Sequence, residues 1–179
     1  MNEDTFEDDD FLLDEGLDPL EELLQQIESR WAELGAVLTA LSEEEACRPD
    51  LVGAWSAKDV MAHIAAWERE GARRMDEIVR GNGAALSWPD RAGEDAFNAT
   101  AVAASRAKTR DEVLKGMTEA HQDFVDLLAA FGEEVMTTEL EVPAVEWIPG
   151  WTYLHYQEHA PQIRALRTPT GRGGTSNGS

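Results

Sequence analysis

Apolar residues recur along most of this chain at intervals of three and four positions, the spacing that gathers them on one face of an α-helix. The first such segment covers residues 19–41 and opens with Pro19, a residue suited to the first turn of a helix. The second begins at the capping box of residues 56–59 and continues to about Arg80, where Gly81 ends it. Both segments predict long amphipathic helices.

The rest of the chain predicts two further long helices and the connections between them. A capping box at residues 42–45 predicts one extra turn, and the alanine-rich residues 94–106 predict a short helix within a long crossover. Another capping box at residues 109–112 opens the third amphipathic helix. Residues 132–148 contain a proline that interrupts a helix and predict irregular backbone, and the last helix is expected over residues 150–166.

Four long amphipathic helices with almost no strand signal predict an all-α, antiparallel four-helix bundle with a long crossover between its second and third helices. The bundle is expected to span residues 18–167. Residues 1–17 are strongly acidic and predict a flexible leader, and residues 168–179 are rich in Gly, Ser and Thr and predict a flexible tail. The length of 179 residues is consistent with this single domain.

Charge and composition narrow the functional classes. With 36 acidic and 15 basic residues the net charge is −21, and such a surface repels phosphate backbones, so no nucleic-acid partner is expected. No segment approaches the ~20 apolar residues needed to span a bilayer, and the first residues do not form a secretory signal, so we expect a cytoplasmic protein without a membrane partner. One cysteine, Cys47, excludes an internal disulfide and a Cys-rich zinc site.

Candidate chemistry lies with the histidines. His155 and His159 are four residues apart, so their rings project from one face of the last helix, at a spacing that lets two imidazoles chelate one metal ion. His63 lies in the apolar stripe of the second helix, where a buried imidazole needs a polar partner. It would complete a three-histidine site with open coordination positions, as a catalytic divalent metal requires. The spacing leaves open the alternative that these are core histidines bonded to backbone carbonyls.

Several neighbouring residues have alternative roles. Residues 155–159 match H-x-x-E-H, a zinc-peptidase signature, but no acid follows to supply the third ligand, so a peptidase is excluded. Glu158 is a candidate for proton transfer or a solvated surface acid. Asp59 is a candidate for orienting the histidine four residues later, although the capping-box spacing favours a bond to the helix start. His121 is expected to line the core or a crevice, and Pro161 is expected to kink the last helix.

A family resemblance adds to these patterns. The segment G-A-W-S-A-K-D-V-M-A-H-I-A-A-W-E at residues 53–68 resembles the G-x-W-S-x-K-D-x-x-x-H-x-x-x-W segment of the DinB-like superfamily. The spacing His155-x-x-x-His159-x-x-Gln162 is similar to that of its last helix, and the likeness is greatest to the ClbS/DfsB and maleylpyruvate-isomerase N-terminal branches. The resemblance implies a bundle of up-up-down-down type. It also implies a divalent metal, zinc or nickel, held by His63, His155 and His159.

Two functions of different classes follow from this resemblance. The first is a metal-dependent enzyme, a thiol S-transferase or hydrolase acting on a small electrophilic molecule, for which a low-molecular-weight thiol is a candidate cofactor. The alternative is a non-catalytic bundle that binds and sequesters a small molecule. A homodimer is also expected, because bundles of this superfamily often pair.

Overall fold

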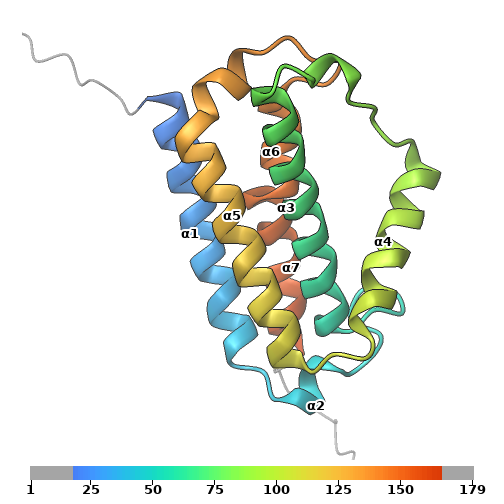
Figure 1. The fold of residues 1–179 in the computed structure, drawn as a ribbon. Coiled ribbons are helices and arrows are strands. Elements are labelled where there is room, and N and C mark those ends of the chain that lie inside the picture. The colour runs from blue at the N-terminus through green and yellow to red at the C-terminus, as the bar shows by residue number, and fades with distance from the viewer. Residues whose placement is uncertain (1–17, 167–179) are drawn as a thin grey trace, which may run out of the picture.

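Four columns of helix lie side by side in the computed structural model, which describes residues 18–166 (Figure 1). The columns are α1 (Pro19–Thr39), α3 (Ala57–Val79), α5 (Arg110–Thr137), and α6 (Ala144–Trp151) followed by α7 (Tyr153–Ala165). The connections contain α2 (Glu43–Ala46), the 3-10 turn η1 (Gly83–Ala85) and α4 (Arg91–Ser105). The described part of the chain has no strand in this order of elements, and none of its helices is both long and apolar enough to cross a membrane.

The crossover through η1 and α4 sets the directions of the helices. α3 runs away from the end of the bundle that carries α2, and the crossover brings the chain back to that end, so α5 runs parallel to α3 (Figure 1). α1 and the column of α6 and α7 run the opposite way. This confirms the predicted all-α four-helix bundle with a long crossover between its second and third long helices. The predicted leader, residues 1–17, and tail, residues 168–179, lie outside the described residues, and the homodimer stays a prediction.

Local capping explains where the long helices begin. The Asp18 carboxylate accepts a hydrogen bond from the first turn of α1. Ser56 and Asp59 form a reciprocal capping box at the start of α3, and Thr109 and Glu112 form another at the start of α5. Each box satisfies backbone N–H groups that have no partner inside the helix. These starts agree with the sequence patterns because a cap depends only on residues within one turn.

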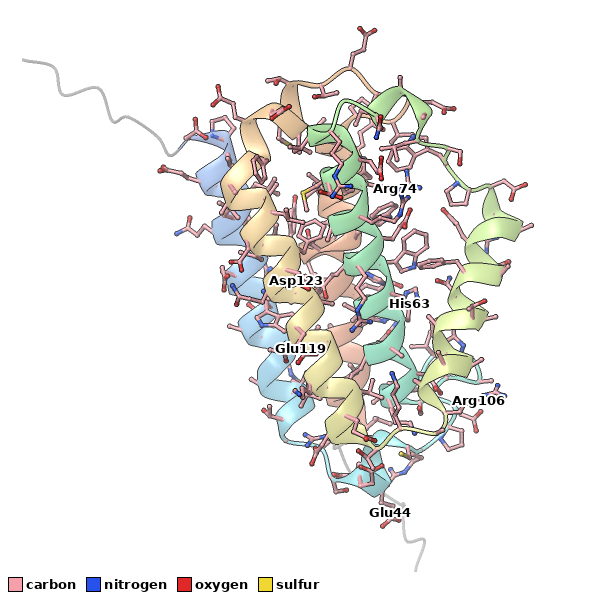
Figure 2. The ribbon with its side chains drawn as sticks, in the orientation of Figure 1. Glu44, His63, Arg74, Arg106, Glu119 and Asp123 are labelled. Atoms are coloured by element: carbon pink, nitrogen blue, oxygen red, sulfur yellow. The ribbon has the colours of Figure 1, made fainter. Side chains whose placement is uncertain are left out.

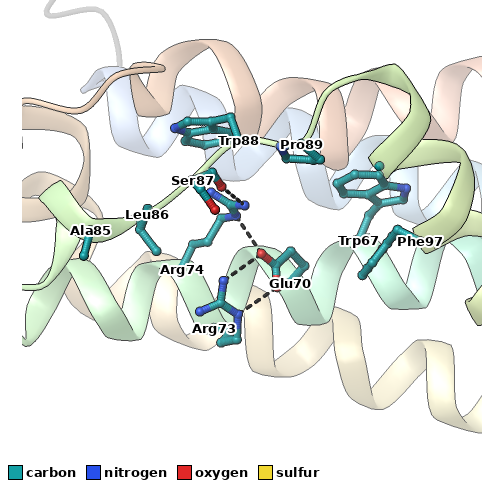
Figure 3. Close-up of a pocket in the computed structure, with 11 residues that line it drawn as sticks. Trp67, Glu70, Arg73, Arg74, Ala85, Leu86, Ser87, Trp88, Pro89 and Phe97 are labelled. Carbon is teal, nitrogen blue, oxygen red and sulfur yellow. Dashed lines mark hydrogen bonds and ion pairs between the residues drawn. The ribbon is translucent and has the colours of Figure 1, made fainter.

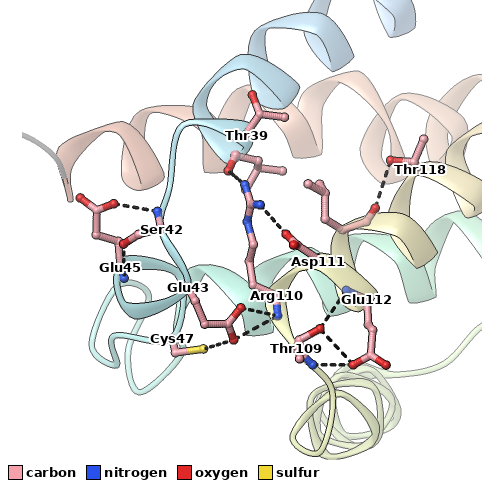
Figure 4. Close-up of polar contacts among 12 residues, drawn as sticks. Thr39, Ser42, Glu43, Glu45, Cys47, Thr109, Arg110, Asp111, Glu112 and Thr118 are labelled. Carbon is pink, nitrogen blue, oxygen red and sulfur yellow. Dashed lines mark hydrogen bonds and ion pairs between the residues drawn. The ribbon is translucent and has the colours of Figure 1, made fainter.

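Polar contacts fasten the end of α1, the turn α2 and the start of α5 to one another (Figure 4). The Glu43 carboxylate accepts a hydrogen bond from the backbone N–H of Arg110, at 3.0 and 3.2 Å to its two oxygens. A negative charge at this position also interacts favourably with the N-terminus of α5. The Arg110 guanidinium in turn donates to the carbonyl oxygen of Leu38 at 2.8 Å. One acid and one arginine therefore join three elements.

The irregular backbone predicted for residues 132–148 is wrong over most of its length. α5 continues to Thr137 because its buried stripe continues through Val135. α6 begins directly after Pro143, whose φ of −58° is compatible with the position before a helix. The proline therefore precedes the helix and does not interrupt it.

The break between α6 and α7 lies later than the sequence indicates. Thr152 has φ of −125° and ψ of −108°, which is not helical, so the last helix begins at Tyr153 and not at residue 150. The Thr152 hydroxyl donates to the carbonyl oxygen of Ile148 at 2.6 Å, which provides a partner for a carbonyl at the end of α6. Pro149 is accommodated within α6, two residues before that end.

Close packing of α3 against α5 depends on Gly71. A Cβ atom at this position would lie 2.4 Å from the Phe124 ring and 3.4 Å from that of Trp147. We expect Gly71→Ala to lower the free energy of unfolding by about 1 kcal/mol, because overpacking costs about 1–3 kcal/mol and exceeds the gain of about 1 kcal/mol in helix propensity. Urea denaturation measures this. The control is Gly35→Ala on α1, because no atom lies within 4 Å of a Cβ added there. This variant should raise the free energy of unfolding by about 0.5–1 kcal/mol. Equal gains in both variants would contradict the packing argument.

Candidate metal centre

Three histidines from two columns meet inside the bundle. His63 lies within α3, and His155 and His159 lie one turn apart on α7 (Figure 2 labels His63). Each offers one ring nitrogen, and these three atoms lie within 4.8 Å of one another. The three residues are only 8, 9 and 4% exposed, respectively. The structure therefore brings together all three residues that the sequence marks as candidate ligands.

Asn98 of α4 determines which nitrogen of His63 carries the proton. Its Oδ1 accepts a hydrogen bond from Nε1 of Trp67 at 2.9 Å, which identifies the atom as an acceptor. Nδ1 of His63 lies 2.9 Å from the same oxygen and must donate to it. In the neutral ring, Nε2 therefore carries the lone pair, and it lies 2.7 Å from Nε2 of His155. The crossover helix thus prepares His63 to act as a ligand through Nε2.

Gln162 has the corresponding role for the last histidine. Nδ1 of His159 lies 2.7 Å from Oε1 of Gln162, one turn further along α7. When Nδ1 donates to this oxygen, the lone pair of the neutral ring is on Nε2. Histidines that ligate metals are usually oriented by such a bond from the second ring nitrogen. α7 remains helical across Pro161, so the proline does not separate the two residues, and the kink itself stays a prediction.

Burial keeps His63 and His155 neutral. Desolvation, assisted by the neighbouring charge of His159, lowers the pKa of His63 to about 4. Desolvation, followed by the charges of His63 and His159, also lowers the pKa of His155 well below its ordinary value. A neutral imidazole is the form that binds a metal, because the lone pair has to be free. At neutral pH these two rings therefore need to release no proton before they can act as ligands.

The donor set fits a divalent metal of the zinc type. Imidazole nitrogens suit zinc and nickel, and three protein ligands leave a coordination position open. Without a cation, a lone pair on Nε2 of His63 would face Nε2 of His155 at 2.7 Å, which is favourable only if the His155 ring places its proton there. A shared metal removes this restriction, because both nitrogens can then point their lone pairs to the same place.

The other two predicted site residues, Asp59 and Glu158, are not part of this group. The Asp59 carboxylate accepts hydrogen bonds from the backbone N–H and the hydroxyl of Ser56, at 2.9 and 2.8 Å, so it caps α3 as the spacing favours. Asn98, and not Asp59, holds Nδ1 of His63. Glu158 is exposed to solvent on α7, between the two histidines in sequence. Asn98 was not predicted, because its only signal is a polar side chain in an alanine-rich segment.

A second buried polar group was also missed. Glu68 of α3 is fully buried, and its Oε1 lies 3.1 Å from Nδ1 of His121 on α5 and accepts a hydrogen bond from the hydroxyl of Tyr156 on α7. The His121 ring stacks on Trp31 with 3.8 Å between ring centroids. His121 thus lies in the core, as expected, but as part of a polar cluster. Desolvation raises the pKa of Glu68, although hydrogen bonds from His121 and Tyr156 oppose this.

Solved structures of three other proteins share this fold. The colibactin self-resistance protein ClbS, in complex with a dsDNA, has a TM-score of 0.73 and 16% identity over 84% of this chain and 96% of its own. The Sibling Lethal Factor Precursor, DfsB, has a TM-score of 0.69 and 14% identity over 82% and 93% of the two chains. A mutant of the mycothiol-dependent maleylpyruvate isomerase has a TM-score of 0.60 and 14% identity over 81% of this chain and 60% of its own. No curated protein sequence matches this chain.

The exclusion of nucleic acids as partners is wrong. It rests on the net charge of −21, yet the ClbS structure contains dsDNA bound to a protein of the same fold. Net charge sums over the whole chain, whereas binding depends on the charges that lie on one face. In this chain the basic side chains are few, but the acidic ones are unevenly distributed, with eleven of them in residues 1–22. The total charge is therefore a poor guide to any single face of the bundle.

A comparison of the sequence with models of protein families identifies the family of this chain. The sequence model of the DinB superfamily matches residues 26–163, a span that contains the three histidines and Asn98. The match covers well over half of the chain and agrees with the shared fold of the three solved structures. The chain belongs to the DinB superfamily.

Proposed function

We propose that this protein is a divalent-metal-dependent enzyme, a thiol S-transferase or a hydrolase that acts on a small electrophilic molecule. Zinc or nickel would be held by His63, His155 and His159. The observation that carries the proposal is the convergence of three buried ring nitrogens within 4.8 Å. Two further findings support it: membership of the DinB superfamily and the shared fold with a mycothiol-dependent isomerase.

Each part of the proposed site has a separate role. A divalent metal, when held by the three histidines, would supply a nucleophile at neutral pH, from a water molecule or from a thiol. Asn98 and Gln162 would keep the lone pairs of His63 and His159 on Nε2. Burial lowers the pKa of His63 and of His155, so these two rings are neutral at pH 7. We propose Glu158 as the group that exchanges protons with solvent, because it is exposed beside the ligands on α7.

The test is elemental analysis of the chain purified without a histidine tag, followed by an activity assay. We expect about one equivalent of zinc or nickel per chain. We also expect conversion of a small electrophile such as 1-chloro-2,4-dinitrobenzene by a low-molecular-weight thiol, or its hydrolysis without the thiol. Chelation should abolish the reaction, and added metal should restore it.

The opposite result would favour a non-catalytic bundle that sequesters a small molecule. A chain that contains no metal and takes up none on titration would reject the metal-dependent enzyme. A cavity between α3 and the crossover favours this second function, because a binding protein needs a cavity and no metal. Short dsDNA belongs among the ligands tested, since ClbS is solved in complex with a dsDNA.

A further inference from the structure

A cavity of about 450 Å³ lies between α3 and the crossover segment that leads into α4 (Figure 3). Three aromatic side chains line it: Trp67 from α3, Trp88 from the crossover and Phe97 from α4. α3 also contributes Glu70, Arg73 and Arg74. Cavities of this volume, with aromatic walls and a few charged groups, are typical of sites for small organic molecules.

The charged groups leave the cavity with a positive charge. Glu70 accepts two hydrogen bonds from Arg73, at 2.7 and 2.8 Å, and one from Nε of Arg74 at 2.8 Å. Burial acts to raise the pKa of Glu70, but the two arginines outweigh it and the pKa is lowered, so the acid stays charged. Two guanidinium groups and one carboxylate line the cavity, so the lining carries one excess positive charge; Glu77, which is not part of the lining, also acts on Arg73. The positive charge of this lining contrasts with the net charge of −21 of the whole chain.

Arg74 is held in place but is not fully paired. The residue is only 3% exposed, and its Nη2 donates to the carbonyl oxygen of Ser87 at 2.9 Å. Its Nη1 is buried and has no hydrogen-bond partner among residues 18–166. The guanidinium lies 4.1 Å from the centroid of the Trp88 ring, in cation–π contact. A buried guanidinium nitrogen without a partner is costly. Arg74 lines the cavity, so an anion bound there would lie beside its guanidinium group and interact favourably with its charge.

Trp67 connects the cavity to the three histidines through hydrogen bonds at Asn98. The ring of Trp67 lines the cavity, and its Nε1 donates to Oδ1 of Asn98, which also accepts from Nδ1 of His63. Trp67 also contacts Phe97, with 4.7 Å between ring centroids. A molecule resting on Trp67 would therefore contact the same indole whose Nε1 donates to Asn98.

We propose that this cavity binds a small organic anion in which a carboxylate is joined to a flat apolar body. The carboxylate pairs with Arg73 and Arg74, whose planar guanidinium groups match its geometry. The flat body packs against Trp67, Trp88 and Phe97, which offer aromatic faces. That the bound molecule is also the substrate rests on the proposed function, whereas the binding itself does not.

Isothermal titration calorimetry of the full chain, treated with a chelator to remove metal, tests the proposal. The probe is 2-naphthoate, and 2-naphthamide is the uncharged molecule with the same rings. We expect one binding site for 2-naphthoate and at least tenfold weaker binding of 2-naphthamide. Arg73→Gln should weaken 2-naphthoate binding at least tenfold. The side chain of Arg73 is half exposed, so the variant should fold.

The matched control is Arg80→Gln. Arg80 caps the end of α3, is largely exposed and pairs with Asp76 outside the cavity, so its loss changes the net charge equally. Its Kd for 2-naphthoate should stay within twofold of the wild type. Equal binding of naphthoate and naphthamide, equal loss in both variants, or no binding at all would overturn the proposal. Because the protein carries no metal in this experiment, anion binding by a chain that takes up no zinc would reject the enzyme and retain the anion site.

Discussion

Replacing His159 by alanine is expected to lower the zinc affinity of this protein by more than about a hundredfold and to leave the bundle folded. The loss exceeds the 10–100-fold that outer groups around a metal typically contribute, because a ligand itself is removed. His159 is buried, and within the described part of the chain its side chain hydrogen-bonds only to Gln162, so its removal leaves no charged group there unpaired. Zinc titration against a competing chelator measures the affinity, and circular dichroism measures the helix content.

Two further variants provide comparisons for the loss of zinc affinity expected in His159→Ala. Asn98→Ala removes the bond that fixes the His63 ring and should cost about 10–100-fold in zinc affinity. Gln157→Ala changes an exposed side chain on α7, between the two histidines, and should leave the affinity unchanged. If the His159 variant kept full zinc content, the three-histidine site would be wrong. If all three variants lost zinc equally, the effect would be one of helix stability and not of ligation.

The largest effect on stability is expected from His121→Ala. Its loss leaves the fully buried Glu68 with one partner fewer, opens space beside Trp31 and removes the stacking contact. Removing one member of a buried pair typically costs about 3–5 kcal/mol. Urea denaturation should show a loss of this size in the free energy of unfolding. Because burial raises the pKa of Glu68, the acid can become neutral as the pH falls, so the difference from the wild type should shrink toward acidic pH.

A combined variant separates the lost pair from the lost volume. Glu68→Leu, His121→Leu and Tyr156→Phe together remove every polar atom of the cluster, and apolar replacement of a whole buried network is often close to neutral. This triple variant should be more stable than His121→Ala alone. A triple variant that is less stable would show that the cluster stabilises the fold through its hydrogen bonds. Zinc binding should survive in His121→Ala, because His121 is not one of the three ligands.

The fold was predictable from the sequence where it depends on neighbouring residues. The capping boxes of α3 and α5 and the four-residue spacing of the α7 histidines are contained within one or two turns. The C-terminal end of α5 was not predictable in this way. The sequence pattern gave too much weight to Pro143, which precedes α6 and does not interrupt a helix. A proline restricts its own and the preceding residue, and tertiary packing decides on which side of it a helix continues.

The surroundings of the site were not predictable in the same way. Asn98 meets His63 across 35 positions of sequence, and Tyr156 meets Glu68 across 88. Spacing along one helix cannot tell which residue of another helix lies opposite. Glu68 did offer a signal, because it lies four residues after Ile64 in the inward stripe of α3, where a charge needs a partner. Spacing and the apolar stripe suggested the three histidines as a possible site, and the family resemblance supported the pairing between the two helices.

The distance along the chain between His63 and His155 has a consequence for the order in which the protein folds. The two rings are 92 residues apart in sequence, so the site cannot form until α7 has docked on the bundle. Contacts with such long loops are costly in entropy and tend to form late, after local helix pairs. An ion bound there would lengthen the lifetime of the native state, because interactions absent from the transition state slow unfolding and leave the folding rate largely unchanged. The ion would thus slow unfolding by linking α7, near the end of the described chain, to α3 in its first half.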